Sequence, residues 1–250
     1  MANGCISISR ILEKLDGHLG RNDYAAAERH LLYWLSESRG SCDGRTELLI
    51  INELMGLYRK LGRESDALEY AHAALSKIHE LGVEDQVGSA TAYLNAATVY
   101  KAFGRAADAI PLFERARTVY ERELDDGDSR LGGLYNNTAL ALVDLGRFAE
   151  ATELYGKAVA VMKRAAGGEL EVAITYLNMA SAAEAECGLL DADERIQSYL
   201  DGAEAILEAY EKRDGYYAFV CDKCASVFGY YGRFFYENEL KERARRIYGG

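Results

Sequence analysis

A glycine recurs along this chain at a fixed interval. It stands, 42 residues apart each time and 44 at the last step, at Gly20, Gly62, Gly104, Gly146, Gly188 and Gly232. In the first four copies Leu or Phe precedes the glycine, arginine follows it and an alanine lies five residues later. A constant period of this length is the signature of a protein built from stacked structural repeats.

Each glycine separates two stretches whose apolar residues have helical spacing. Around Gly104 the apolar positions fall at offsets of three and four on both sides: Tyr93, Ala96, Ala97 and Tyr100 before it, and Ala109, Leu112, Phe113, Ala116 and Val119 after it. The pattern predicts helical hairpins. The first helix is expected to end at the glycine, which adopts the left-handed conformation without a side-chain penalty.

Alanines recur where the two helices of a hairpin must approach closely. They lie five residues after the glycine at Ala25, Ala67, Ala109 and Ala151, and twelve residues after it at Ala74, Ala116 and Ala158. The fifth copy brings its alanine one residue early, at Ala192. Pro111, the one proline, is expected early in a second helix, where its missing N–H costs least.

A single hairpin cannot bury its own apolar face, so neighbouring hairpins must stack. We therefore expect an all-α protein, a right-handed superhelical solenoid of about six antiparallel helix pairs. The first helices should line its curved inner surface. Residues 1–250 are expected to form one domain, with repeats at about 5–40, 46–82, 88–124, 130–166, 170–210 and 215–248.

The repeated skeleton resembles the tetratricopeptide repeat, and its length narrows the resemblance. The standard unit has about 34 residues, whereas the longer unit is similar to the repeats of kinesin light chains and their bacterial relatives. Residues 93–104 and 134–146 resemble the asparagine-rich first helix of that group, and residues 74–82 resemble the end of its second helix. The loops lack the group's His-Pro pair and no heptad coiled coil precedes the repeats, so we do not expect a kinesin subunit.

The resemblance implies peptide binding on the concave face, through a first-helix asparagine whose amide both donates and accepts hydrogen bonds. Asn95 and Asn137 lie nine residues before their turns, and Asn178 does so if counted from Cys187. The expected peptide-binding residues are these three, Asn136 beside Asn137, Asn52 beside Glu53 (the equivalent position of repeat two), and Lys101 as a positive charge near one end. The alternative is that each asparagine bonds a neighbouring helix or its own backbone.

Chaperone-binding relatives add a basic clamp for a terminal carboxylate. Four residues before Asn95, Asn137 and Asn178 this chain has Thr91, Gly133 and Ile174. The clamp is missing there, so an acidic C-terminal motif is not the expected ligand.

Composition restricts the partner and the compartment. A net charge of −11 argues against binding of a phosphate backbone, and no apolar run reaches the roughly 18 to 20 residues of a membrane span. The start of the chain has no signal-peptide pattern, and five scattered cysteines favour reduced thiols. We expect a cytoplasmic protein with a protein or peptide partner, no nucleic acid and no membrane.

No motif predicts catalysis, a metal or a cofactor. Cys221 and Cys224 have the spacing of redox and zinc sites, but the four histidines lie far away in sequence, so packed thiols are expected. His72 and His79 are too far apart on one helix, by roughly 10 Å of rise, to share a metal. Phosphate loops and nucleophile elbows are absent from the sequence.

The sequence therefore favours a non-enzymatic scaffold that holds a peptide or protein. Two alternatives remain: a peptide-responsive sensor acting on a separate output protein, and a self-assembling structural protein. The last repeat also crowds ten aromatic residues between Tyr216 and Tyr248. We expect a homodimer through this repeat, unless the rings fold inward and the charged last helix forms a polar cap.

Overall fold

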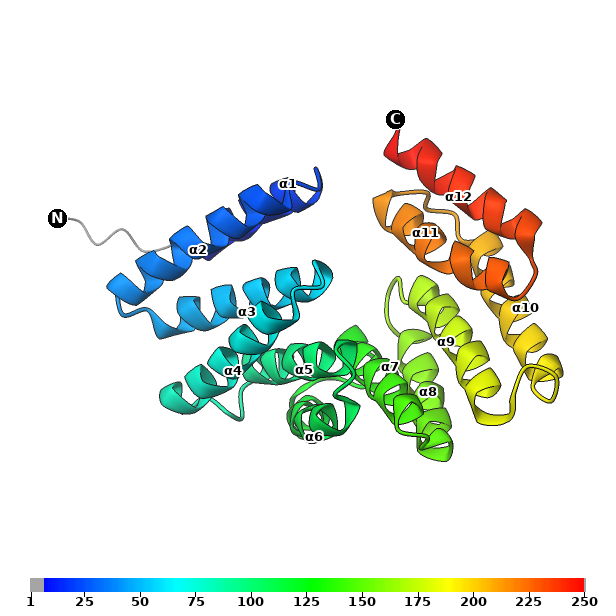
Figure 1. Ribbon diagram of the computed structural model, residues 1–250, viewed down its shortest axis with the longest axis horizontal. Helices are drawn as coiled ribbons and strands as arrows, with labels where there is room; N and C mark the ends of the chain where they lie inside the picture. The colour runs from blue at the N-terminus through cyan, green and yellow to red at the C-terminus, as the bar shows by residue number, and fades with distance from the viewer. Residues whose placement is uncertain (1–6, 250) are drawn as a thin grey trace. The chain divides into compact units, whose positions relative to one another are not determined.

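The computed structural model describes residues 7–249, and this part of the chain contains twelve α-helices and no strand. Its contacts divide it into two compact units, residues 1–123 and 124–250. Each unit contains three antiparallel helix pairs (Figure 1).

Unit 1 is built of three stacked pairs, in which α2 contacts α3 and α4 contacts α5. Its helices are α1 (Ile8–Leu19), α2 (Tyr24–Gly40), α3 (Gly44–Lys60), α4 (Glu64–Leu81), α5 (Val87–Ala102) and α6 (Ala106–Glu123). A core that includes Leu31, Ile50, Leu54 and Ala71 joins the first two pairs.

Unit 2 repeats this arrangement, with α8 against α9 and α11 against α9. Its helices are α7 (Ser129–Asp144), α8 (Phe148–Met162), α9 (Glu169–Cys187), α10 (Asp193–Ala209), α11 (Gly215–Tyr230) and α12 (Phe234–Tyr248). Leu177, Leu200, Phe228 and Leu240 belong to the core of the last two pairs.

The all-α class and the six helix pairs are confirmed. The six helix pairs span residues 8–40, 44–81, 87–123, 129–162, 169–209 and 215–248. The repeat bounds remain predictions, and residues 5 and 6 of the first repeat lie outside the described part. The single domain remains a prediction.

The repeated skeleton explains the turn inside each pair. Gly62, Gly104, Gly146 and Gly232 have φ between 67° and 83°, in the left-handed region that favours glycine. In repeats two to four the arginine after this glycine immediately precedes the second helix and pairs with the acid three residues on: Arg63 Nε lies 2.7 Å from Asp66, and the same geometry recurs at Arg105–Asp108 and Arg147–Glu150. These ion pairs are exposed, so we expect each to add little stability.

The prediction of a left-handed Gly20 is wrong. Gly20 has φ −63°, and the left-handed residue of the first pair is Asn22, with φ 55°. Asparagine tolerates this conformation because its short polar side chain bonds locally, and here Asn22 Oδ1 accepts from the Tyr24 hydroxyl at 2.7 Å. The turn of the first pair therefore lies two residues later than the glycine period predicts.

The alanine prediction holds in repeats two to five and fails in the first, because the turn of the first pair lies two residues later. In repeats two to four, the alanines that lie five and twelve residues after the turn glycine are at most 1% exposed. Ala192 of repeat five is buried to the same degree. Ala25 is exposed, and Ala27 occupies the buried position instead. Small side chains at these positions let the paired helices pack closely.

Pro111 lies deeper in its helix than predicted. Because α6 begins at Ala106, Pro111 is its sixth residue, past the first turn where the missing N–H would be free. Because proline has no N–H, the carbonyl of Ala107, four residues earlier, loses its helical hydrogen bond. Ala107 is exposed to solvent.

Aspartates begin the first helix of several pairs. The side chains of Asp43, Asp128 and Asp214 accept backbone N–H bonds at the starts of α3, α7 and α11. Behind the first of these caps lies Glu47, only 7% exposed, which pairs with Arg39 of α2 and Lys77 of α4. The linkers between pairs are thus fixed as well as the turns within them.

Candidate functional site

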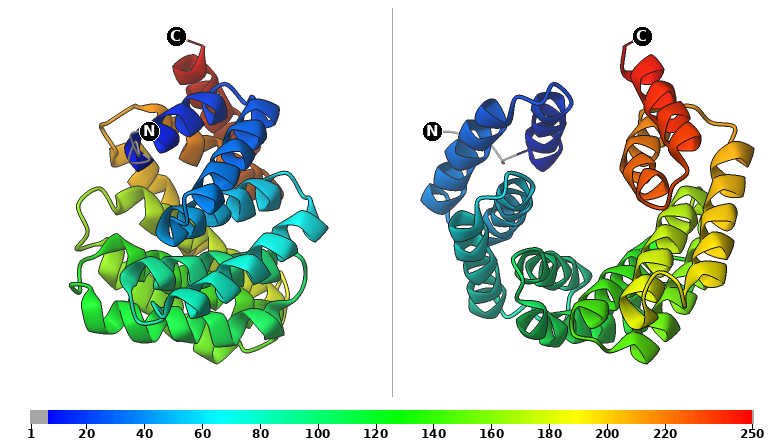
Figure 2. Two further views of the ribbon diagram at one scale, coloured as in Figure 1. Left: turned by 90° about the vertical axis from the view of Figure 1, so that its left-hand side faces the viewer. Right: turned by 45° about the vertical axis from the view of Figure 1, so that its right-hand side comes forward.

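The first helices of the pairs carry all the asparagines predicted to bind a peptide. In unit 1, α3 and α5 are in contact, and in unit 2, α9 contacts α7 and α11. Figure 2 shows the first helices of each unit on one side and the second helices on the other. We call the side formed by α1, α3 and α5, or by α7, α9 and α11, the first-helix face of that unit.

In unit 1, two predicted residues meet across this face. The Asn95 amide nitrogen on α5 donates to the Asn52 amide oxygen on α3 at 3.0 Å. Both side chains are half-buried. A primary amide has two N–H donors and an oxygen with two lone pairs, so one mutual bond leaves most of this capacity for a ligand.

Unit 2 contains an equivalent pair of hydrogen-bonded asparagine side chains. Asn178 on α9 donates to Asn136 on α7, again at 3.0 Å. Asn137 has a different role, because its amide nitrogen donates to the Gly133 carbonyl of its own helix at 2.8 Å. The two amide pairs are thus Asn52–Asn95 and Asn136–Asn178, and the bonds that the alternative interpretation expected, to a neighbouring helix or the same helix, are present.

A groove of about 380 Å³ lies between α3 and α5, and Asn52 belongs to its wall. We call it the α3–α5 groove; its lining is Arg45, Leu48, Leu49, Asn52, Glu53, Leu81, Val83, Gln86, Gly88, Ser89, Thr91 and Ala92. Apolar side chains form much of this surface, and the amide, carboxyl and guanidinium groups are few. Such a mixture suits an extended peptide with an apolar side chain.

The charges of the groove are weakly compensated. Burial raises the pKa of Glu53, and the nearby carboxylate of Asp16 raises it further. Arg45 is exposed at the groove's edge. Lys101 lies half-buried in the last turn of α5 and is not part of the groove lining.

Thr91, Gly133 and Ile174, which stand where chaperone-binding relatives have basic residues, have structural roles. The Thr91 hydroxyl lies 2.7 Å from the Tyr120 hydroxyl and donates to the Val87 carbonyl. Gly133 supplies the carbonyl that Asn137 binds, and Ile174 is buried.

A second cavity, which the sequence analysis missed, lies in unit 2. It has about 580 Å³ and lies between the loop before α9 and the end of α10, with lining residues Lys163, Gly167, Glu169, Val172, Ile206, Ala209, Tyr210, Glu211 and Lys212. Its walls come from loop and helix-end residues that share no motif or period. Only the fold brings them together.

The two paired cysteines are packed thiols. Cys221 and Cys224 are at most 1% exposed, and burial raises the pKa of Cys221 to about 11 and that of Cys224 to about 12. Both therefore hold their protons at neutral pH, which removes the reactive thiolate. Among the described residues no cluster of three His, Cys, Asp or Glu side chains is suited to hold a metal ion.

The aromatic residues of the last repeat divide between core and surface. Tyr217, Phe228 and Tyr236 are buried, whereas Tyr216, Phe219, Tyr230, Phe234, Phe235 and Tyr248 are between 41% and 96% exposed. Neither the fully inward nor the fully exposed arrangement is observed.

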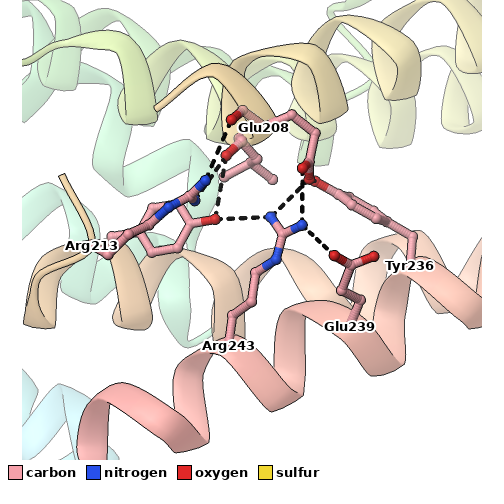
Figure 3. Close-up of polar contacts among 7 residues, drawn as sticks. Glu208, Arg213, Tyr236, Glu239 and Arg243 are labelled. Carbon is pink, nitrogen blue, oxygen red and sulfur yellow. Dashed lines mark hydrogen bonds and ion pairs between the residues drawn. The ribbon is translucent and has the colours of Figure 1, made fainter. Parts of the chain in front are cut away.

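A polar cluster joins this repeat to α10 (Figure 3). The Arg243 guanidinium donates to both Glu208 oxygens, at 2.7 and 2.9 Å, and also to Glu239. Tyr236 donates to the same Glu208, and Arg213 donates to the carbonyls of Leu207 and Glu208. The Arg243 hydrogen bonds, the largest contribution, lower the pKa of Glu208. This cluster holds α10 and α12 together and leaves little capacity for a ligand.

None of the helices in the described residues is long and apolar enough to span a bilayer.

Comparison with known proteins identifies the repeats. Models of the tetratricopeptide repeat match residues 47–122 and residues 132–169. No curated protein matches the chain.

Several solved structures share the fold. BtubC (BKLC) from P. vanneervenii has a TM-score of 0.70 at 20% identity over 82% of each chain. Kinesin light chain repeats from P. anserina have a TM-score of 0.55 at 18% identity over 80% of this chain and 94% of that one. The quorum sensor NprR from B. thuringiensis has a TM-score of 0.60 at 18% identity over 95% of this chain and 64% of that one. These identities support a shared fold alone.

Proposed function

We propose that the chain is a scaffold that binds a peptide or protein segment on its first-helix faces. It is built of tetratricopeptide repeats, and this fold generally mediates protein–protein interaction. The observation that carries this proposal is the Asn52–Asn95 amide pair beside the α3–α5 groove. An extended peptide has one N–H and one carbonyl per residue, and a half-buried amide pair offers partners for both.

The groove also favours a particular kind of ligand. Leu48, Leu49 and Leu81 offer apolar contacts, so the bound segment should place an apolar side chain between α3 and α5. Glu53 lies in the same wall with a raised pKa. A protonated carboxyl group donates a hydrogen bond, whereas an ionised one repels an acidic ligand. We expect a neutral or basic apolar segment.

The Asn136–Asn178 pair supports a second contact of the same chemistry in unit 2. A chain with two such pairs can hold two segments of one partner or two partners. Binding through both units would raise the apparent affinity if one ligand spans them.

The sensor hypothesis has one observation in its favour. NprR is described as a quorum sensor, and one of its solved structures, with a TM-score of 0.57 to this chain, contains its cognate peptide NprX. If this chain is such a sensor, a short free peptide should saturate it. If it is a scaffold, a segment within a larger protein should bind equally well.

Peptides selected from a random library on the immobilised protein, followed by calorimetry, test the proposal. Asn52→Ala and Asn95→Ala should each weaken binding by about 1 kcal/mol or more, because a ligand hydrogen bond is lost. Asn238→Ala, an exposed asparagine on α12, serves as the matched control and should bind like the wild type. If the amide pair only holds helices together, the two groove variants will melt at lower temperature but bind the selected peptides unchanged.

A further inference from the structure

The outer side of the first helix pair carries a basic groove that the repeat pattern does not explain. This groove, about 650 Å³ in volume, lies between α1 and α2 and contains Arg10, Lys14 and Arg29 but no carboxylate in its lining. We call it the N-terminal basic groove. In a chain with a net charge of −11, such a concentration of positive charge is a local exception.

The three cations are also unpaired. Arg10, Lys14 and Arg29 are exposed, and none forms an ion pair with any described residue. Most arginines and lysines elsewhere do, including Arg63, Arg243 and Lys77. No carboxylate of the described residues therefore lies within ion-pair distance of the three groove cations.

Aligning the turn of the first helix pair with that of the second shows which residues of α3 correspond to the groove residues of α1. The first turn places Asn22 where the second has Gly62, because Asp23 N–H bonds to the His18 carbonyl as Arg63 N–H bonds to that of Tyr58. Residues of α1 thus correspond to residues of α3 forty positions later.

In this register Arg10, Lys14 and His18 correspond to Ile50, Leu54 and Tyr58. Those three are at most 5% exposed and belong to the core shared with α2, the second helix of the preceding pair. Tyr58 also donates to Glu28 of α2 at 2.9 Å. The basic groove therefore corresponds to a helix-docking surface on which two of the three contact positions, Arg10 and Lys14, carry cations.

We propose that the N-terminal basic groove binds an acidic helix of a partner protein. Arg10, Lys14 and His18 follow at intervals of four residues, so they rise along α1 by about 6 Å each. A helix laid along α1 with carboxylates at the same interval presents an acid to each of them.

Aromatic groups supply the rest of the surface. The Trp34 ring lies edge-on to Tyr33 and His30, with ring centroids 5.2 and 6.5 Å apart, and Tyr33 is 57% exposed. His30 and His18 form a ring pair at 5.9 Å, in the place of the Tyr58–Tyr70 pair of the next repeat. These rings offer contact area to the apolar flank of an acidic helix.

Charge favours a protein helix over a nucleic acid. A nucleic-acid backbone is acidic along its whole length, and beyond the groove it would meet the acidic remainder of the chain. A helix with a few carboxylates on one side matches the limited extent of the groove.

Trp34 is the only tryptophan and lines the groove, so its fluorescence reports on binding directly. The probe is an alanine-based helical peptide with a glutamate at every fourth position, titrated into the full chain. We expect a saturable change in Trp34 emission that weakens as salt rises, because salt screens exposed charges. The same peptide with glutamines should produce no change at equal concentration.

Charge-reversal variants locate the site. Arg10→Glu with Lys14→Glu should weaken binding at least about tenfold, since two attractive contacts become repulsive. Arg245→Glu with Arg246→Glu makes the same change in net charge on exposed arginines of α12 and should leave the affinity within about twofold. All four side chains are exposed, so folding is retained, which circular dichroism checks.

The proposal is overturned if the glutamate peptide does not bind, if the glutamine peptide binds as well, or if both double variants weaken binding equally. Tighter binding of a single-stranded RNA of equal charge would identify the groove as a nucleic-acid site instead and would also overturn it.

Discussion

Among the described residues, the Tyr155 hydroxyl is the one buried side-chain nitrogen or oxygen without a hydrogen-bond partner. Burial raises the pKa of Tyr155 far above its ordinary value, so the group remains a neutral hydroxyl. A small cavity of about 30 Å³ adjoins this side chain.

Removing this hydroxyl should not destabilise the protein. An unpaired buried hydroxyl costs about 1 to 3 kcal/mol, so Tyr155→Phe is expected to leave the free energy of unfolding unchanged or to raise it. Tyr236→Phe is the matched control, because Tyr236 donates to Glu208 at 2.7 Å and its loss should lower stability by about 1 kcal/mol. Urea unfolding measures both; a Tyr155→Phe variant as destabilised as the control would mean that the hydroxyl has a partner.

At the scale of single residues, the sequence predicts which asparagines lie on the first helices better than it predicts the hydrogen bonds that they form. The spacing before the turn predicts Asn95, Asn137 and Asn178, whereas Asn52 and Asn136 are predicted only as neighbours of such positions. The hydrogen bonds of all five depend on how adjacent helices are offset. Asn137 has the predicted spacing and bonds its own helix, whereas its neighbour Asn136 meets Asn178. One residue of helical rotation, roughly 100°, decides between these outcomes, and periodicity alone does not fix it.

The elements themselves were largely predictable, because the same local signals repeat along the chain. A glycine in the left-handed region, an arginine paired with the acid three residues on, and a buried alanine recur in one order in repeats two to four. The turn of the first helix pair was predicted wrongly, because Asn22 and not a glycine occupies its left-handed position. The glycine period pointed to Gly20, two residues too early.

The close packing of paired helices predicts the effect of a larger side chain. Ala109 is fully buried on α6, which packs against α5. Ala109→Leu should lower the free energy of unfolding by about 1 to 3 kcal/mol, because the added carbons must displace packed neighbours. Ala107→Leu, at an exposed position of the same helix, should change it by less than about 0.5 kcal/mol. Equal thermal stability of the two variants would contradict the assigned packing.

For the whole molecule, the grooves were the least predictable features. The α3–α5 groove, the cavity in unit 2 and the N-terminal basic groove each combine residues from two or more elements. No contiguous motif encodes them. The basic groove becomes visible in the sequence only after the turn register of the first repeat is known.

The homodimer remains a hypothesis with a clean test. Phe235 is 96% exposed, so Phe235→Glu should leave the melting temperature unchanged. If the last repeat forms the dimer, this variant should be monomeric in light scattering while the wild type has twice its mass. A wild-type chain that is monomeric under the same conditions would exclude the dimer.

The central claim is that the amide pairs on the first-helix faces contact a bound segment. The most direct measurement follows the side-chain NH₂ signals of the asparagines by ¹⁵N NMR while a selected peptide is added, with each signal assigned from its Asn→Ala variant. We predict that the signals of Asn52 and Asn95 shift saturably and that the signal of Asn238 on α12 stays in place. Saturable binding that leaves the Asn52, Asn95, Asn136 and Asn178 signals unmoved would contradict the account.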